Sequence, residues 1–190
     1  MIRIHRLVVV DNEHLYGPGK RLLLFLQGCS IHCNGCVNKH LWSFDGGKDY
    51  TTEELIKICI DEKVEGVTFH GGEPLDQAYE LYSFANRIKD INLSIVLFTG
   101  YLKKELDKLQ KKIWNMSDIV IAGRFDIKKR NVNLQFRGST NQKVYMHKGK
   151  YKNYKIEDGY TTAIICIDEN GDMNVNGFYT DDIAKLVGDK

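Results

Sequence analysis

The sequence predicts an α/β fold with parallel strands, a partial (incomplete) TIM-like βα barrel, and three observations support this fold class. Short apolar segments alternate with amphipathic segments along residues 21–122, which is typical of βα units around a parallel sheet. A loop that contains glycine follows each of the four predicted strands in this region. About four βα rounds fit within the 190 residues, whereas a complete eight-fold barrel takes about 250. An open doubly wound sheet is the alternative.

The first two rounds are read as follows. Residues 21–26 form a continuous apolar run that ends in a glycine, typical of a strand buried on both faces. Thr51 and Glu54 have the spacing of a capping box, which predicts a helix running toward residue 62. Residues 66–70 are predicted as the next strand, and Asp76 is predicted to cap the helix that follows it.

The remaining elements follow the same logic. Next come a strand at 93–98, an amphipathic helix carrying Leu102, Leu106, Leu109 and Ile113, and a strand at 118–122. Two further strands are predicted at 160–167 and 173–175, with a turn at 169–172 and a last helix starting at 180–182.

The chain is interpreted as one domain, residues 1–190, because this length is short for two. It comprises a cysteine-containing loop at 28–40, a βα core at about 21–123, and a basic and C-terminal segment at about 124–190. Hydrophobic residues make up 43% and charged residues 27%, which indicates a soluble globular protein. No apolar run resembles a signal peptide or approaches the roughly 20 residues of a membrane helix. A cytoplasmic location without membrane partners is expected.

Three cysteines, Cys29, Cys33 and Cys36, lie within eight residues, with no fourth cysteine nearby. Three thiolates leave one coordination position open, where a substrate could bind. An iron–sulfur cluster fits best, because thiolates suit iron–sulfur cores. A zinc site completed by His32 or His40, and a redox dithiol formed by the last two cysteines, are the other readings.

The other two cysteines, Cys59 and Cys166, each lie in an apolar stretch. Small thiols in such surroundings behave as core side chains. Both are therefore predicted to be buried rather than to bind metal.

The loops that follow the predicted strands begin at Gly28, Gly71, Thr99 and Gly123. Loops at the carboxyl ends of parallel strands gather on one face, so the cysteine loop and the Gly-Gly-Glu-Pro loop at 71–74 should be neighbours. In that loop two glycines expose the backbone, and a carboxylate could accept from an ammonium group. The alternative is an ordinary βα turn with a capping glutamate.

Positive charge concentrates in residues 124–155, where ten Lys or Arg residues stand against one acid, Asp126, in a chain of net charge +2. This segment is either a solvated basic face or a docking surface for an anionic protein or nucleic acid.

The cysteine spacing, Cys29-x3-Cys33-x2-Cys36, together with the Gly-Gly-Glu-Pro loop, resembles the radical S-adenosylmethionine superfamily. Within it the chain resembles the family of glycyl-radical enzyme activases that act on anaerobic ribonucleoside-triphosphate reductase. The segments that carry this second resemblance are 11–12, 16–21, 26–29, 42–47, 136–142 and 177–178.

The resemblance implies the site residues. Cys29, Cys33 and Cys36 would hold three irons of one [4Fe-4S] cluster, whose fourth iron would bind the methionyl part of S-adenosylmethionine. The other cofactor-binding residues would be Gly35, Cys36, Val37, Gly71, Gly72, Glu73, Thr99 and Gly100, of which 71–73 would receive the amino group. The superfamily often has an aromatic residue where this chain has Gly35.

The resemblance also implies an oxidoreductase. One electron from the reduced cluster would cleave S-adenosylmethionine, and the resulting 5′-deoxyadenosyl radical would take a hydrogen from a glycine of the reductase. No side chain is needed as acid or base, so no catalytic residue is assigned. Flavodoxin or ferredoxin would supply the electron, and a nucleic-acid partner is not expected. The alternatives are an activase or tailoring enzyme for another polypeptide or small molecule, and a zinc-stabilised nucleic-acid-binding module.

Two hypotheses concern residues outside the motifs. His70, Tyr101 and Arg124 lie at strand ends and are candidate contacts to cofactor or substrate, although His70 is better explained as a hydrogen-bonded residue beneath the site. The basic segment 124–155, with Lys128, Lys129 and Arg130, is expected to help dock the reductase.

Overall fold

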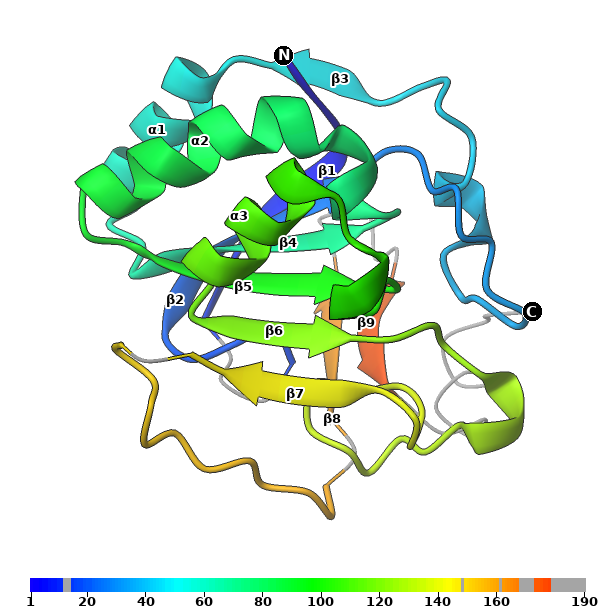
Figure 1. Cartoon of the computed structure of the whole chain (residues 1–190). Helices are drawn as coiled ribbons and strands as arrows, with labels where there is room; N and C mark the ends of the chain where they lie inside the picture. The colour runs from blue at the N-terminus through cyan, green and yellow to red at the C-terminus, as the bar shows by residue number, and fades with distance from the viewer. Residues whose placement is uncertain (12–14, 148, 161, 168–172, 179–190) are drawn as a thin grey trace.

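The computed structural model describes residues 1–11, 15–147, 149–160, 162–167 and 173–178 (Figure 1). A seven-stranded sheet has the order β3-β1-β2-β4-β5-β6-β7, and a two-stranded sheet pairs β8 with β9. The strands are β1 Ile2–Asp11, β2 Lys20–Leu26, β3 Lys48–Tyr50, β4 Gly66–Gly71, β5 Ser94–Thr99, β6 Ile119–Ala122, β7 Lys143–Met146, β8 Thr162–Ile167 and β9 Met173–Phe178. The fold is therefore mixed α/β, as predicted.

The four central strands, β2, β4, β5 and β6, run parallel and follow the order of the sequence. All four were predicted within one or two residues. The sequence did not predict β1 and β3, which add antiparallel strands to one side of the sheet. β7 closes the other side, also antiparallel.

Three α-helices connect the parallel strands: α1 Thr52–Asp61, α2 Ala78–Asp90 and α3 Lys108–Met116. The predicted capping box of α1 is present, with Thr51 accepting from the Glu54 amide. The predicted cap of α2 is wrong, because a 3-10 turn at Pro74–Gln77 precedes the helix and the Asp76 carboxylate bonds instead to the cysteine loop. The third helix is shorter than its apolar spacing predicted, because Asp107 caps it.

All three helices cover the same face of the sheet (Figure 1). Right-handed crossovers that always advance in one direction along the sheet place every helix on one side, and the order of β2, β4, β5 and β6 does so. Leu22, Leu24 and Leu26 face these helices. Their neighbours Leu23 and Phe25 pack under residues 15–16 and 41 on the opposite face. A doubly wound sheet would have helices on both faces, so the described residues disfavour that alternative.

The second half of the opposite face is covered by the basic segment. Phe136 and Tyr151 pack onto Val96, Ile119 and Ile121 there. Apart from the 3-10 turn at Ile127–Lys129 and β7, this part of the chain is irregular within the described residues. Its side chains therefore act as a cover for the sheet.

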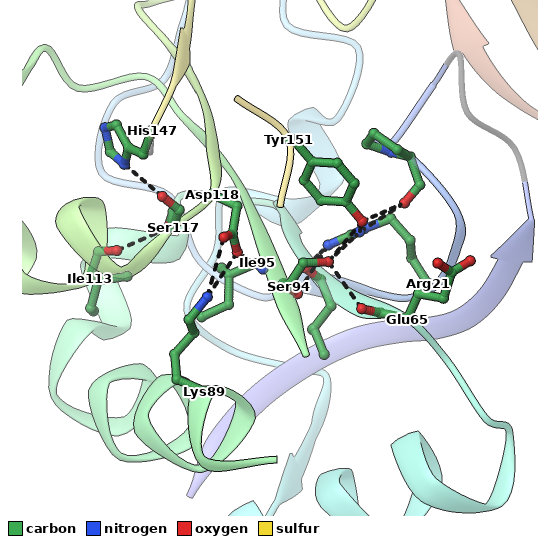
Figure 2. A network of polar contacts seen from close by, with 12 residues as sticks. Arg21, Glu65, Lys89, Ser94, Ile95, Ile113, Ser117, Asp118, His147 and Tyr151 are labelled. Carbon is green, nitrogen blue, oxygen red and sulfur yellow. Dashed lines mark hydrogen bonds and ion pairs between the residues drawn. The ribbon is translucent and has the colours of Figure 1, made fainter. Parts of the chain in front are cut away.

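A polar network closes the end of the sheet where the parallel strands begin (Figure 2). The Arg21 guanidinium is fully buried and donates to Thr68 Oγ1 at 2.8 Å, Ser94 Oγ at 3.0 Å and the Val67 carbonyl at 2.8 Å. It also lies 3.5 Å from the Tyr151 hydroxyl. One side chain thus joins β2, β4, β5 and the covering segment.

Several smaller predictions have an outcome. Cys59 is buried in α1, and burial raises the pKa of its thiol to about 12, which confirms a core role. The predicted strands at the C-terminus are present as β8 and β9. The side chain of Cys166, the turn at 169–172 and the helix predicted from 180–182 lie outside the described residues. Among those residues, no helix is long and apolar enough to cross a bilayer.

Candidate functional site

The cysteine loop starts two residues after β2 and is fixed at its beginning by backbone bonds. The amide of Gly28 donates to the Leu41 carbonyl at 2.9 Å, and the amide of Cys29 donates to the Trp42 carbonyl at 3.1 Å. The His32 ring stacks on Trp42, with ring centroids 4.5 Å apart. Residues 41 and 42 therefore form a fixed support for one side of the loop.

All three cysteines of the loop are free thiols. Cys29 is buried, and Cys33 and Cys36 are half-buried. Burial raises the pKa of Cys29 and of Cys33, so both are neutral thiols in the metal-free chain. Iron binding would release their protons, as metal–thiolate bonds require.

The turn between the last two cysteines depends on Gly35. The Cys36 amide donates to the Cys33 carbonyl at 3.1 Å, and Gly35 has φ +77°, which favours glycine. A Cβ on Gly35 would lie 2.6 Å from the Cβ of Ile127. An aromatic side chain at this position would overlap Ile127.

The glycine loop after β4 contacts the cysteine loop directly, as predicted. The amide of Gly72 donates to the Leu26 carbonyl at 2.9 Å, and the amide of Glu73 donates to the Gly28 carbonyl at 2.8 Å. A Cβ on Gly72 would lie 2.0 Å from the Gly28 oxygen. Only glycine permits this approach, so the two loops are joined through their backbones.

Glu73 is buried within the loops, with 2% of its surface exposed. Its Oε1 accepts from the Leu75 amide at 2.9 Å and from Thr99 Oγ1 at 2.8 Å, and its Oε2 accepts from the Gly100 amide at 2.8 Å. Burial raises the pKa of this carboxyl to about 7, although these donors favour the ionised form. A carboxylate has about four acceptor positions, so the three bonds above leave room for one further donor.

The loops after β5 and β6 complete the arrangement. A Cβ on Gly100 would lie 2.6 Å from Ile31 Cδ1, so the β5 loop touches the cysteine loop. The β6 loop reaches it through Ile127, which lies against Gly35. Four loops that are distant in sequence thus gather at the carboxyl ends of the parallel strands, as predicted.

The further candidates at the strand ends have different surroundings. His70 Nδ1 accepts from the Gly71 amide at 2.7 Å, and the ring lies among Tyr16, Phe25 and Phe98. Burial lowers the pKa of His70 to about 4, so the ring is neutral. This confirms the interpretation of His70 as a hydrogen-bonded residue beneath the site.

Tyr101 and Arg124 contact each other, with the guanidinium carbon 5.9 Å from the ring centroid. Arg124 Nη1 also forms an ion pair with Glu105 at 2.9 Å. The Tyr101 hydroxyl donates to Asp76 Oδ1 at 2.9 Å. Both side chains therefore belong to the wall formed by the β5 and β6 loops.

The residues that sequence reasoning missed are Ser30, Trp42, Asp76 and Ile127. Asp76 had a signal, but it was read as a helix cap. Trp42 lies in the segment 42–47 that carries the family resemblance, but no pattern pointed to its contact with the cysteine loop. Ile127 had no signal, because its contact with that loop arises only from the fold.

The two histidines considered for zinc already have ring contacts: His32 stacks on Trp42, and His40 meets His5 edge to face at 5.2 Å. In the part of the chain that the structure describes, no three His, Cys, Asp or Glu side chains gather around one metal-ion position. A [4Fe-4S] cubane instead binds each thiolate through a different iron.

The chain was compared with family models, curated proteins and solved structures. Residues 15–145 match the family model described as a 4Fe-4S single cluster domain. Three relatives are named anaerobic ribonucleoside-triphosphate reductase-activating protein. The protein of Vibrio cholerae is 34% identical, and the match covers 68% of this chain and 89% of the relative. The protein of Haemophilus influenzae is 34% identical, with 70% of this chain and 91% of the relative covered. The protein of Pasteurella multocida is 36% identical, with 68% of this chain and 89% of the relative covered. Among solved structures, QueE from Escherichia coli is 19% identical, with a TM-score of 0.43 over 52% of each chain.

Proposed function

Because the chain belongs to the family of anaerobic ribonucleoside-triphosphate reductase-activating proteins, we propose that it activates such a reductase by generating a glycyl radical on it. The observation that carries this proposal is the loop with three free thiols, joined by backbone bonds to the glycine loop. The family match spans both loops.

The residues present fit a [4Fe-4S] cluster. Cys29, Cys33 and Cys36 would hold three of its irons, and the open fourth position would take S-adenosylmethionine. The cluster and S-adenosylmethionine supply the reductive cleavage and the radical that removes hydrogen from a glycine of the reductase. The task of this chain is to hold both cofactors, to orient them, and to keep water away.

The cofactor-binding residues are proposed as they were inferred from the motifs. The backbone of Gly71 and Gly72, with the remaining acceptor position of Glu73, would receive the amino group of S-adenosylmethionine. The rest of the molecule would lie along Gly35, Cys36, Val37, Thr99 and Gly100. Val37 is 79% exposed, so it is accessible to the cofactor.

We further propose that the seven-stranded sheet is an incomplete barrel within one domain. Support comes from the four parallel strands in sequence order and from the helices on a single face. A closed barrel would restrict the entry of a protein loop, whereas an incomplete one leaves a side for the glycine of the reductase.

A docking surface for the reductase is proposed at the edge of the site. Ile127, Val37 and Phe44 are 41%, 79% and 51% exposed around the cysteine loop. Exposed basic side chains follow directly at 128–130. Exposed apolar groups beside cations suit a protein partner whose contacting surface is acidic.

Charge reversal tests this surface. Changing Lys128, Lys129 and Arg130 to Glu is expected to weaken the complex with the reductase at least tenfold at low salt, because long-range attraction becomes repulsion. The matched control reverses Lys108, Lys111 and Lys112, which are exposed on α3, and binding should there stay within about twofold. Equal binding by both triple variants, measured by calorimetry, would rule out the proposed surface.

The activity itself is tested by anaerobic incubation of the iron-loaded chain with the reductase, S-adenosylmethionine and a low-potential donor such as reduced flavodoxin or ferredoxin. A glycyl-radical doublet in electron paramagnetic resonance is expected on the reductase. Cleavage of S-adenosylmethionine without that doublet would point to another polypeptide or small-molecule substrate. A colourless protein that takes up one zinc in place of iron would contradict the proposal altogether.

A further inference from the structure

Asp76 connects three of the loops that form the site. Its Oδ2 accepts from the backbone amide of Ser30 at 2.7 Å, and its Oδ1 accepts from the Ser30 hydroxyl at 2.9 Å. The Tyr101 hydroxyl donates to the same Oδ1 at 2.9 Å and lies 2.9 Å from the Ser30 hydroxyl. These three side chains come from the loops after β4, β2 and β5 and form a closed ring of hydrogen bonds.

The local sequence would favour another role for this carboxylate. Asp76 lies one position before the N-cap of α2, close to where an aspartate commonly caps a helix. In the structure the N-cap of α2 is Gln77, which makes no side-chain cap bond. Gln77 instead binds the backbone of Arg3 and Gln27. The α2 N-terminus therefore lacks a side-chain cap, while both polar residues before it hold neighbouring strands and loops.

Ser30 directly follows Cys29, so fixing its amide fixes the peptide unit next to the first thiol. The Cys29 amide is already held by Trp42. Because Asp76 accepts from the amide of Ser30, the backbone on both sides of the Cys29 side chain is restrained. Hydrogen bonds to a charged acceptor are about twice as strong as those between neutral groups, so this restraint is substantial.

We propose that Asp76 is a positioning residue for the iron–sulfur cluster, acting through Ser30 to hold Cys29 in the direction that iron binding requires. Tyr101 supports it by orienting the carboxylate. This inference rests on the proposed cluster ligation by Cys29. It assigns no chemistry to Asp76, which does not itself bind iron.

The test measures how tightly the cluster is held. Wild-type chain and the variants Asp76→Ala, Asp76→Asn, Ser30→Ala and Tyr101→Phe are loaded with iron and sulfide anaerobically, and iron release to a coloured chelator is timed. Asp76→Ala should release iron about tenfold faster, because it loses charge-assisted hydrogen bonds. Asp76→Asn should fall between it and wild type, since its oxygen still accepts from the Ser30 amide.

Ser30→Ala keeps the backbone amide and should change the rate only about twofold, as should Tyr101→Phe. The matched control is Asp61→Ala, which removes an exposed aspartate of α1 that pairs with Lys57; its rate should equal that of wild type. The paramagnetic spectrum of the reduced cluster should broaden in Asp76→Ala and not in the control. Thermal melting of the metal-free variants separates this effect from a loss of the fold.

Iron release and a spectrum unchanged in Asp76→Ala would overturn the inference. If that variant fails to fold, rates for Asp76→Asn, Ser30→Ala and Tyr101→Phe that all equal wild type would overturn it as well. None of these measurements contains S-adenosylmethionine or the reductase. A wild-type chain that binds a cluster without producing a glycyl radical would therefore contradict the proposed function and leave this inference standing.

Discussion

Gly72 has no room for a side chain, because a Cβ would lie 2.0 Å from the Gly28 carbonyl oxygen. Changing Gly72 to Ala should separate the two loops and break the backbone bonds from residues 72 and 73. The expected loss in the free energy of unfolding is roughly 3–5 kcal/mol. Gly46→Ala is the control: its φ of +92° favours glycine, but nothing lies within 4 Å of the added Cβ, so about 1–2 kcal/mol is expected. Equal losses in urea unfolding would contradict the close approach.

Glu73 should make the stability of the metal-free chain depend on pH. Burial raises its pKa from 4.5 to about 7, so between these values the folded chain keeps a proton that the unfolded chain has lost. Stability from this group is therefore complete below pH 4.5 and decreases as pH rises toward 7. The whole shift corresponds to roughly 3 kcal/mol.

The measurement compares wild type with Glu73→Gln by urea unfolding at pH 5, 6, 7 and 8. From pH 5 to pH 8, the free energy of unfolding of wild type should fall by about 2–3 kcal/mol relative to that of Glu73→Gln. His70 titrates in both proteins, so its contribution cancels. A difference that does not change with pH would show that the buried carboxyl has its ordinary pKa.

At the scale of elements, the Arg21 network joins three parallel strands to the segment that covers them (Figure 2). The guanidinium donates to acceptors in several directions, a geometry that an ammonium group does not reproduce. Arg21→Lys should therefore lower the free energy of unfolding by about 2–4 kcal/mol. Arg87→Lys, on the exposed side of α2, should change it by less than about 0.5 kcal/mol. Similar values for both variants would contradict the structural role of Arg21.

An element could be predicted where its own residues carry a recognisable hydrophobic pattern, and not where it forms because of a neighbouring strand. β2, β4, β5 and β6 are buried on both faces, so their continuous apolar runs were evident from the sequence. β1 begins with alternating buried and exposed residues and continues half-buried; this alternation is itself a strand signal, and it was missed. β3 has only three residues. Such edge strands exist because a neighbour offers unpaired backbone groups, which local sequence does not reveal.

The residues of the candidate site divide in the same way, into those that a sequence pattern identifies and those whose contacts arise only from the fold. Cys29, Cys33 and Cys36 were identified from spacing, and their proximity to the glycine loop from the rule that parallel strands end on one side of a sheet. Asp76 was misread because a local pattern competed with a long-range partner 46 residues away in sequence. Ile127 was beyond sequence reasoning, since its contact with Gly35 depends on the path of the β6 loop.

At the scale of the whole molecule, the four loops occupy the edge of the sheet in the same order as they occur in the chain. During synthesis, the three thiols therefore emerge first, and Ile127, which packs on Gly35, follows about 90 residues later. At roughly 5–20 residues per second, this interval lasts about 5–20 s. For that time the nascent chain carries three thiols without the wall that later encloses them. The three thiols are therefore most accessible to oxygen during translation, before the β6 loop has been made.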